Sequence, residues 1–68
     1  MIRCKLLQLM ANKGIRQIST LAEETGINRK TLTFLVENKI KRYDADVLSR
    51  LCKYFGCQVG DILEYVKD

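Results

Sequence analysis

The three cysteines are the most reactive side chains of this 68-residue chain, and their spacing argues against catalytic or metal chemistry. Cys4, Cys52 and Cys57 include no Cys-x-x-Cys pair, and the sequence contains no histidine that could act as a zinc ligand or as a general base. We therefore expect reduced, half-buried thiols, no metal ion, no cofactor and no enzymatic activity. Cys4 could act as a redox sensor only if its thiol were exposed and acidic.

The basic residues are the second group that could have a chemical role, because their positive charges are concentrated in one part of the chain. Residues 1–42 carry nine Lys or Arg and three Glu, whereas residues 43–68 carry three Lys or Arg and five acidic residues. The net charge of +4 therefore combines a net charge of +6 in residues 1–42 with a net charge of −2 in residues 43–68. This asymmetry indicates that the first part contacts a polyanion; a solvated basic surface is the alternative.

The elements that must position these residues are predicted from apolar periodicity and from the glycines, since the chain has no proline. Five short helices and no strand are expected, so the fold class is all-α. The predicted helices cover about residues 2–13, a stretch from Gln17 or Ser19 to Gly26, residues 28–37 with Asn28 as N-cap, a stretch from the N-cap Asp44 to Gly56, and a last helix from about Gln58, with Asp61 in a capping box, that includes Ile62, Leu63, Tyr65 and Val66. Residues 38–43 are expected to form a basic loop, in which Asn38 can take the left-handed conformation that ends the preceding helix.

The length of the chain corresponds to one small domain, which we expect to span residues 1–68. No stretch approaches the roughly 20 consecutive apolar residues of a membrane-spanning helix. Residues 1–5 also lack the apolar region of a secretory signal. These observations predict a cytoplasmic protein with no membrane partner.

Residues 18–37 contain the most informative spacing. Ala22 precedes Gly26 by four residues, Ile27 follows in the predicted turn, and Leu32 and Leu35 lie on one face of the next helix. A small side chain at Ala22 lets two helices approach, and Gly26 permits a sharp turn between them. This spacing predicts a helix-turn-helix whose second helix can project into a DNA major groove.

Nearly the whole chain resembles the Xre family of phage repressor and Cro-like helix-turn-helix domains. The matching segments are Gly-Ile at 14–15, Leu-Ala-Glu-Glu-Thr-Gly-Ile-Asn-Arg-Lys-Thr-Leu at 21–32, Lys-Ile-Lys-Arg at 39–42, Leu-Ser-Arg-Leu-Cys-Lys-Tyr-Phe-Gly-Cys at 48–57 and Gly-Asp-Ile-Leu at 60–63. The resemblance implies a compact five-helix bundle and a sequence-specific double-stranded DNA-binding transcriptional regulator, expected to be a repressor.

The resemblance also implies which residues meet DNA, with residues 28–37 as the recognition helix. By position, the groove-facing, base-contacting set is Arg29, Lys30, Thr31, Thr33 and Phe34, with Lys30 and Thr31 nearest the base edges. The phosphate-contacting set is Gln17, Lys39, Lys41 and Arg42. The chemistry agrees, because Arg and Lys donate to guanine O6 and N7, threonine contacts several base edges, and basic loops neutralise phosphates.

The chain departs from the family pattern at several positions. Phe34 stands where relatives usually carry a polar side chain, so it either contacts a thymine methyl or sugar, or turns into the core. Met10 and Val36 replace an arginine and a glutamate that pair in many relatives, and we expect an apolar contact there. The segment between Gly14 and Leu21 is one residue longer than in the commonest members of the family, which leaves the first residue of the second helix open.

Two functional hypotheses remain open. The first is a DNA-binding homodimer at paired half-sites, joined by apolar residues of the fifth helix and its flank or by Leu7; the candidates on the fifth helix are Leu63, Tyr65 and Val66. The alternative is a small protein-interaction module, such as an antitoxin or adaptor, for which DNA is secondary. The basic set on residues 28–42 favours the first, and an apolar patch on the fifth helix would favour the second.

Overall fold

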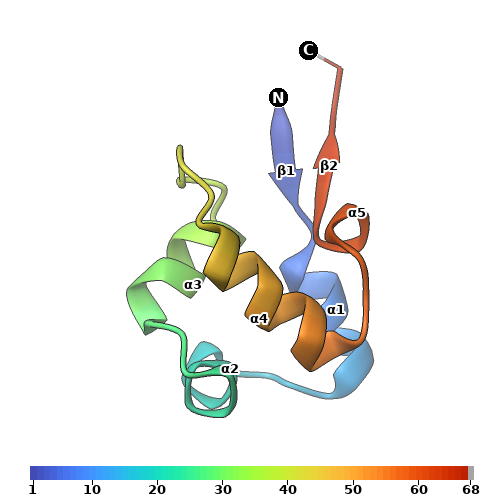
Figure 1. Ribbon diagram of the computed structural model, residues 1–68. Coiled ribbons are helices and arrows are strands. Elements are labelled where there is room, and N and C mark those ends of the chain that lie inside the picture. The colour runs from blue at the N-terminus through green and yellow to red at the C-terminus, as the bar shows by residue number, and fades with distance from the viewer. Residues whose placement is uncertain (68) are drawn as a thin grey trace.

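The computed structural model describes residues 1–67 and is mostly helical, with a small two-stranded sheet at the chain ends (Figure 1). The five predicted helices are all present in these residues. In chain order the elements are β1 (Ile2–Cys4), α1 (Leu6–Lys13), α2 (Ile18–Thr25), α3 (Arg29–Val36), α4 (Ala45–Phe55), α5 (Val59–Ile62) and β2 (Leu63–Tyr65).

The two strands correct the all-α prediction. They run antiparallel in the register Ile2↔Tyr65, Arg3↔Glu64 and Cys4↔Leu63, and project from the helical body (Figure 1). Residues 2–4 were predicted in the first helix and residues 63–66 in the fifth. The strands form because the two chain ends satisfy each other's backbone groups: the Lys5 N–H donates to the Ile62 carbonyl at 2.6 Å.

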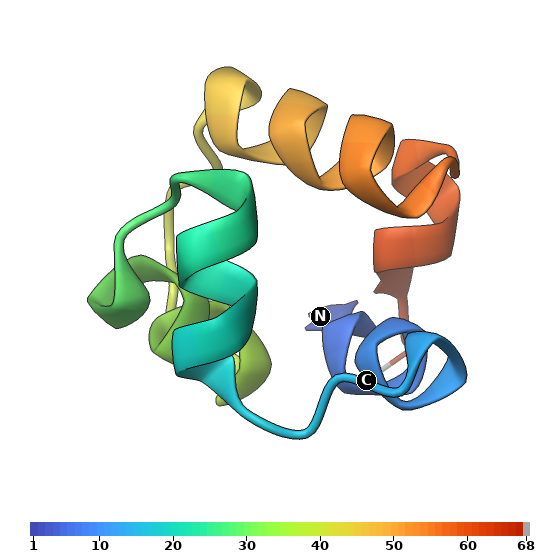
Figure 2. The same cartoon turned by 90° about the horizontal axis from the view of Figure 1, so that it is seen from below.

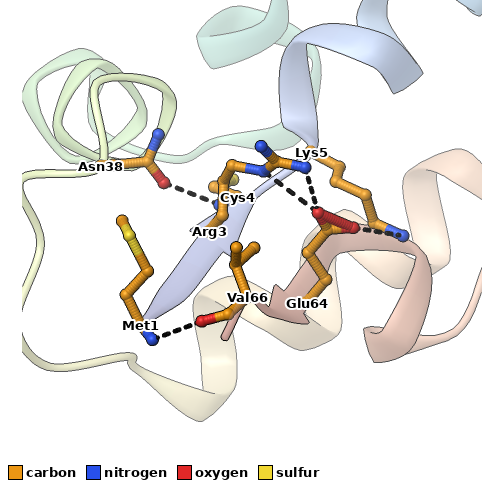
Figure 3. A network of polar contacts seen from close by, with 7 residues as sticks. All are labelled: Met1, Arg3, Cys4, Lys5, Asn38, Glu64 and Val66. Atoms are coloured by element: carbon orange, nitrogen blue, oxygen red, sulfur yellow. Dashed lines mark hydrogen bonds and ion pairs between the residues drawn. The ribbon is translucent and has the colours of Figure 1, made fainter. Parts of the chain in front are cut away.

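The two paired strands, β1 and β2, form a ribbon, and further hydrogen bonds extend it to Met1 and Val66 (Figure 3). The Met1 amino group donates to the Val66 carbonyl at 2.7 Å, and the Val66 N–H donates to the Met1 carbonyl at 2.8 Å. Arg3 donates to the Glu64 carboxylate through Nε at 3.0 Å and also through Nη2. Lys5 Nζ lies 3.8 Å from the same carboxylate. The ribbon therefore carries its charged pair on one face and the Ile2–Tyr65 pair on the other.

The helix ends follow the predicted capping signals. Asn28 Oδ1 accepts the Lys30 N–H at 2.8 Å, Asp44 Oδ1 accepts the Asp46 N–H at 2.8 Å, and Asp61 Oδ2 accepts the Gln58 N–H at 3.0 Å. Helix α2 begins at Ile18 with Gln17 as its N-cap, which settles the start that the sequence left open. Helix α5 has only four residues, so it contains the buried Ile62 but ends before Leu63, Tyr65 and Val66, which were predicted to share its apolar face.

The helices are arranged around a common centre (Figure 2), and the core draws on every helix and on the turn between α2 and α3. Leucines dominate it, and Met10 is 3% exposed while Val36 packs against the core from its rim, as the expected apolar contact requires. No helix among residues 1–67 is long and apolar enough to cross a membrane. The buried residues are Leu6, Met10, Leu21, Ala22, Ile27, Leu32, Leu35, Leu51 and Ile62.

Candidate nucleic-acid interface

The turn between α2 and α3 has the geometry that the spacing predicted. Gly26 has a φ of 75°, and its N–H donates to the Ala22 carbonyl at 2.9 Å, so α2 ends in a left-handed residue. Ile27 is 6% exposed and anchors the turn in the core. Thr25 Oγ1 donates to the Leu21 carbonyl at 2.7 Å and accepts the Ile27 N–H at 3.3 Å, which ties the turn to α2.

Helix α3 has a buried face and an outer face. Leu32 and Leu35 are completely or almost completely buried, whereas Arg29 and Lys30 are exposed in the first turn. The helix lies at the edge of the helical body (Figure 1). An amphipathic helix with a basic N-terminus at the edge of the molecule can approach a DNA groove without moving the core.

The remaining residues predicted to contact bases differ in how they are placed. Phe34 is 39% exposed, so its ring lies on the surface and the core alternative for it is wrong. Thr33 is half-buried. Thr31 is also half-buried and lines a small apolar cavity with Ile40 and Tyr43, so it lies closer to the following loop than expected. Tyr43 is half-buried and packs against the core beside the same cavity.

The residues predicted to contact phosphates are all exposed. Gln17 stands at the N-terminus of α2, where its Oε1 accepts from the Ser19 hydroxyl at 3.3 Å. Lys39, Lys41 and Arg42 lie in the loop that follows α3. Lys39 is the partly neutralised member of this set, because its Nζ lies 3.3 Å from a carboxylate oxygen of the neighbouring Glu37.

Asn38 fixes that loop in a way that the sequence predicted only in part. Its φ is 58°, the left-handed conformation that was expected at this helix end. Its side chain was not predicted to have a role, yet Oδ1 accepts the Cys4 N–H at 2.7 Å and so ties the loop to β1 (Figure 3). The ribbon and the basic loop are therefore connected directly.

Helix α4 supplies further contacts that the sequence analysis missed. Arg50 donates through Nη1 to the Thr25 carbonyl at 3.3 Å and through Nε to Asp46 at 3.0 Å. The Tyr54 hydroxyl donates to Glu24 at 2.6 Å, and this bond raises the pKa of Tyr54. Both contacts hold the C-terminal half of α2. The spacing of Asp46 and Arg50, four residues apart on a helix, was the available signal.

Lys13 completes this contact between helices. Its Nζ donates to the Tyr54 carbonyl at 3.0 Å and lies 4.2 Å from the centre of the Tyr54 ring. The C-terminus of α1 is thus joined to the same α4 residue that holds α2. Polar contacts at the surface therefore join α1 to α4, and α4 to α2 of the helix-turn-helix, in addition to the packing of the core.

The three cysteines pack against the core. All three are free and half-buried, as predicted. Burial raises the pKa of the Cys4 thiol, and it also raises the pKa of Cys57, with smaller contributions from Cys52 and Asp61. A redox-sensing thiol needs the opposite change, so the condition set for Cys4 is not met.

Two comparisons with known proteins agree with this geometry. Residues 5–68 match the family described as the Cro/C1-type HTH DNA-binding domain. The chain is also 36% identical, over 62 residues, to a Bacillus subtilis (strain 168) protein named as the uncharacterized HTH-type transcriptional regulator YozG; the match covers 91% of this chain and 74% of that protein. The resemblance to phage repressor and Cro-like domains is confirmed: the chain belongs to the family of Cro/C1-type helix-turn-helix DNA-binding domains.

Proposed function

We propose that this chain is a transcriptional regulator that binds a specific double-stranded DNA site with α3 in the major groove. The observation that carries the proposal is the pair Arg29 and Lys30, exposed in the first turn of α3 with no acidic partner among residues 1–67. Two cations at a helix N-terminus oppose the helix dipole. Groove edges rich in guanine acceptors, flanked by phosphates, would stabilise them.

The outer face of α3 provides the base contacts. Lys30, Thr33 and Phe34 share this face at helical spacing, with Arg29 at its start, and all four are proposed to reach base edges. Thr31 contributes at the rim of this surface, because it is half-buried beside the loop. Lysine and arginine would read guanine, and a threonine hydroxyl can contact several bases.

The phosphate contacts flank this face on two sides. Gln17 offers its side chain and the N-terminus of α2, and the loop after α3 offers Lys39, Lys41 and Arg42. These contacts would orient the domain on the duplex without reading sequence. Because Lys39 is paired with Glu37, we expect Lys41 and Arg42 to carry most of the loop's contribution.

We also propose that the regulator binds as a homodimer, since one short recognition helix reads too few base pairs to find a site in a genome. Of the residues predicted for the dimer contact, Tyr65 is 72% and Leu7 59% exposed, while Leu63 packs against the core. Tyr65 lies on β2 opposite Ile2, which is 44% exposed. This uncovered pair makes the ribbon, rather than α5, the proposed dimer surface.

Repression in the cytoplasm is the proposed outcome, because occupancy of a site near a promoter is enough to block transcription. The same ribbon supports one alternative. An exposed apolar pair next to Met1, which is 56% exposed, would equally fit a protein partner of an antitoxin or adaptor. In that case the oligomeric state of the purified chain would change on adding the partner rather than on adding DNA.

The test is the salt dependence of duplex binding, after selection of a preferred site from random duplexes. If Arg29, Lys30, Lys39, Lys41 and Arg42 all meet DNA, a dimer releases up to about ten counterions, and the affinity falls by several powers of ten from 50 to 200 mM salt. Fluorescence anisotropy of a labelled duplex measures this slope. A flat dependence, or no enriched sequence, would remove the DNA proposal.

A further inference from the structure

Phe34 is the residue of α3 that neither the core nor the ordinary chemistry of base reading explains. The buried side of the helix is provided by Leu32 and Leu35, with Val36 at its rim. The Phe34 ring instead lies 39% exposed on the outer face. It has no atom that can donate or accept a hydrogen bond, so it cannot read a polar base edge.

The ring is nevertheless held in a defined place on this face. Lys30 lies one helical turn earlier, and its Nζ is 5.7 Å from the centre of the Phe34 ring, within the range of a cation–π contact. The backbone behind the ring is fixed as well, because the Lys39 N–H donates to the Phe34 carbonyl at 2.9 Å. The ring and the ammonium group therefore form one surface with an apolar part and a cationic part.

The major groove offers one kind of apolar target to such a ring. Adenine, guanine and cytosine present nitrogen and oxygen atoms there, whereas thymine also presents a C5-methyl group. We propose that Phe34 determines specificity by packing on the C5-methyl group of a pyrimidine, either thymine or a 5-methylcytosine in its place. This inference rests on the proposed major-groove binding by α3.

The distance between the two parts of the surface limits where that methyl group lies. Successive base pairs rise by about 3.4 Å, so a separation of 5.7 Å spans more than one and fewer than two steps. If Lys30 donates to a guanine, the methyl-bearing pyrimidine lies within two base pairs of it. The selected site should therefore contain a thymine that close to an invariant guanine.

The experiment changes the DNA rather than the protein. Within the selected duplex, each thymine is replaced singly by deoxyuridine, which removes only the methyl group, and affinity is measured by anisotropy at one salt concentration. Wild-type protein should lose about fourfold at one thymine near the guanine in each half-site, the effect expected when one methyl group is no longer buried. A 5-methylcytosine·guanine pair at that position should bind more tightly than an unmethylated cytosine·guanine pair, by a similar factor.

Protein variants then assign the effect to this ring. Phe34→Ala should bind more weakly and show no penalty for deoxyuridine, whereas Phe34→Leu should keep part of the penalty. Val59→Ala, which shortens an exposed apolar side chain on α5, is the matched control and should keep all of it. Circular dichroism checks that each variant is folded.

The outcomes separate this inference from the function on which it rests. Uniform tolerance of deoxyuridine by the wild type, or an unchanged penalty in Phe34→Ala, overturns the role of Phe34 while salt-dependent binding stands. If deoxyuridine is tolerated everywhere, the Phe34 ring contacts a sugar or a protein partner instead of a methyl group. Failure of the wild type to bind any duplex overturns both proposals. Because the deoxyuridine series needs no protein variant, an unfolded Phe34→Ala does not block the test.

Discussion

Gly26→Ala tests whether the helix-turn-helix depends on one left-handed residue and on the Arg50 contact beside it. The backbone at Gly26 has a φ of 75°, a conformation that costs a residue with a Cβ roughly 1–2 kcal/mol. A Cβ built there would also lie 3.0 Å from Arg50 Nη1. Because that atom ends a flexible side chain, we expect Arg50 to move away and lose its bond to the Thr25 carbonyl, about 0.5–1.5 kcal/mol more.

Two other glycines provide matched controls for Gly26→Ala. Gly56 has a φ of 63° with no atom within 4 Å of a built Cβ, so Gly56→Ala should show the conformational cost alone. Gly60 has open space and no positive φ, and alanine in α5 should stabilise the fold by about 0.5–1 kcal/mol. The expected order of free energies of unfolding is Gly60→Ala highest, then wild type, Gly56→Ala and Gly26→Ala.

Urea denaturation followed by circular dichroism measures these free energies, and an Arg50→Ala background isolates the contact. In that background Gly26→Ala should cost no more than Gly56→Ala does in the wild type. The reasoning about Arg50 fails if Gly26→Ala and Gly56→Ala are equally destabilising from the start. The conformational argument fails if both resemble Gly60→Ala.

Three further predictions concern DNA contacts, assembly and pH. Lys30→Ala should lose about 1–3 kcal/mol at the preferred site and relax discrimination at one base pair, whereas Lys41→Ala should weaken all duplexes about equally; identical profiles across a panel of sites would contradict this division. Tyr65→Asp should give a folded monomer with lost cooperativity on DNA, measured by analytical ultracentrifugation and anisotropy; a variant that still forms the dimer would exclude the ribbon surface. The raised pKa of Tyr54 means that folding favours its protonated form, so stability should fall as pH rises from about 10; the raised pKa values of Cys4 and Cys57 act in the same direction, so urea midpoints should show a smaller alkaline loss in Tyr54→Phe than in the wild type, and equal losses would contradict the role of Tyr54.

Local signals predicted the helices well, because caps and apolar spacing act within a few residues. Asn28 and Asp44 were predicted as N-caps and accept the expected N–H groups. The ribbon was missed since Arg3 pairs with Glu64, 61 positions away, and three-residue strands are too short to show an alternating pattern. Ile2 and Leu6, at helical spacing, favoured a longer first helix instead.

The elements that carry the proposed contact residues were predicted more accurately than the packing around them. All nine residues lie on α3, at the start of α2 or in the following loop, as the spacing implied. Thr31 is half-buried and lines a small apolar cavity with Ile40 and Tyr43, a closeness to the following loop that the spacing did not show. Arg50 and Tyr54 were missed since their partners lie on α2, and sequence spacing carries no information about which surface residues of two helices meet.

The two asparagine- or aspartate-capped helices differ in charge in a way that follows from their surroundings. At the N-terminus of α4, Asp44 caps the helix and Asp46 adds a second negative charge, which favours the helix dipole. At the N-terminus of α3, a neutral Asn28 makes an equivalent bond at 2.8 Å, and Arg29 and Lys30 follow it. An aspartate would cap α3 about as well and would complement the dipole, but it would place a negative charge beside the face proposed to enter the DNA groove. The choice of asparagine therefore keeps the cap, worth about 1 kcal/mol, while the end of α3 stays positive for a polyanion.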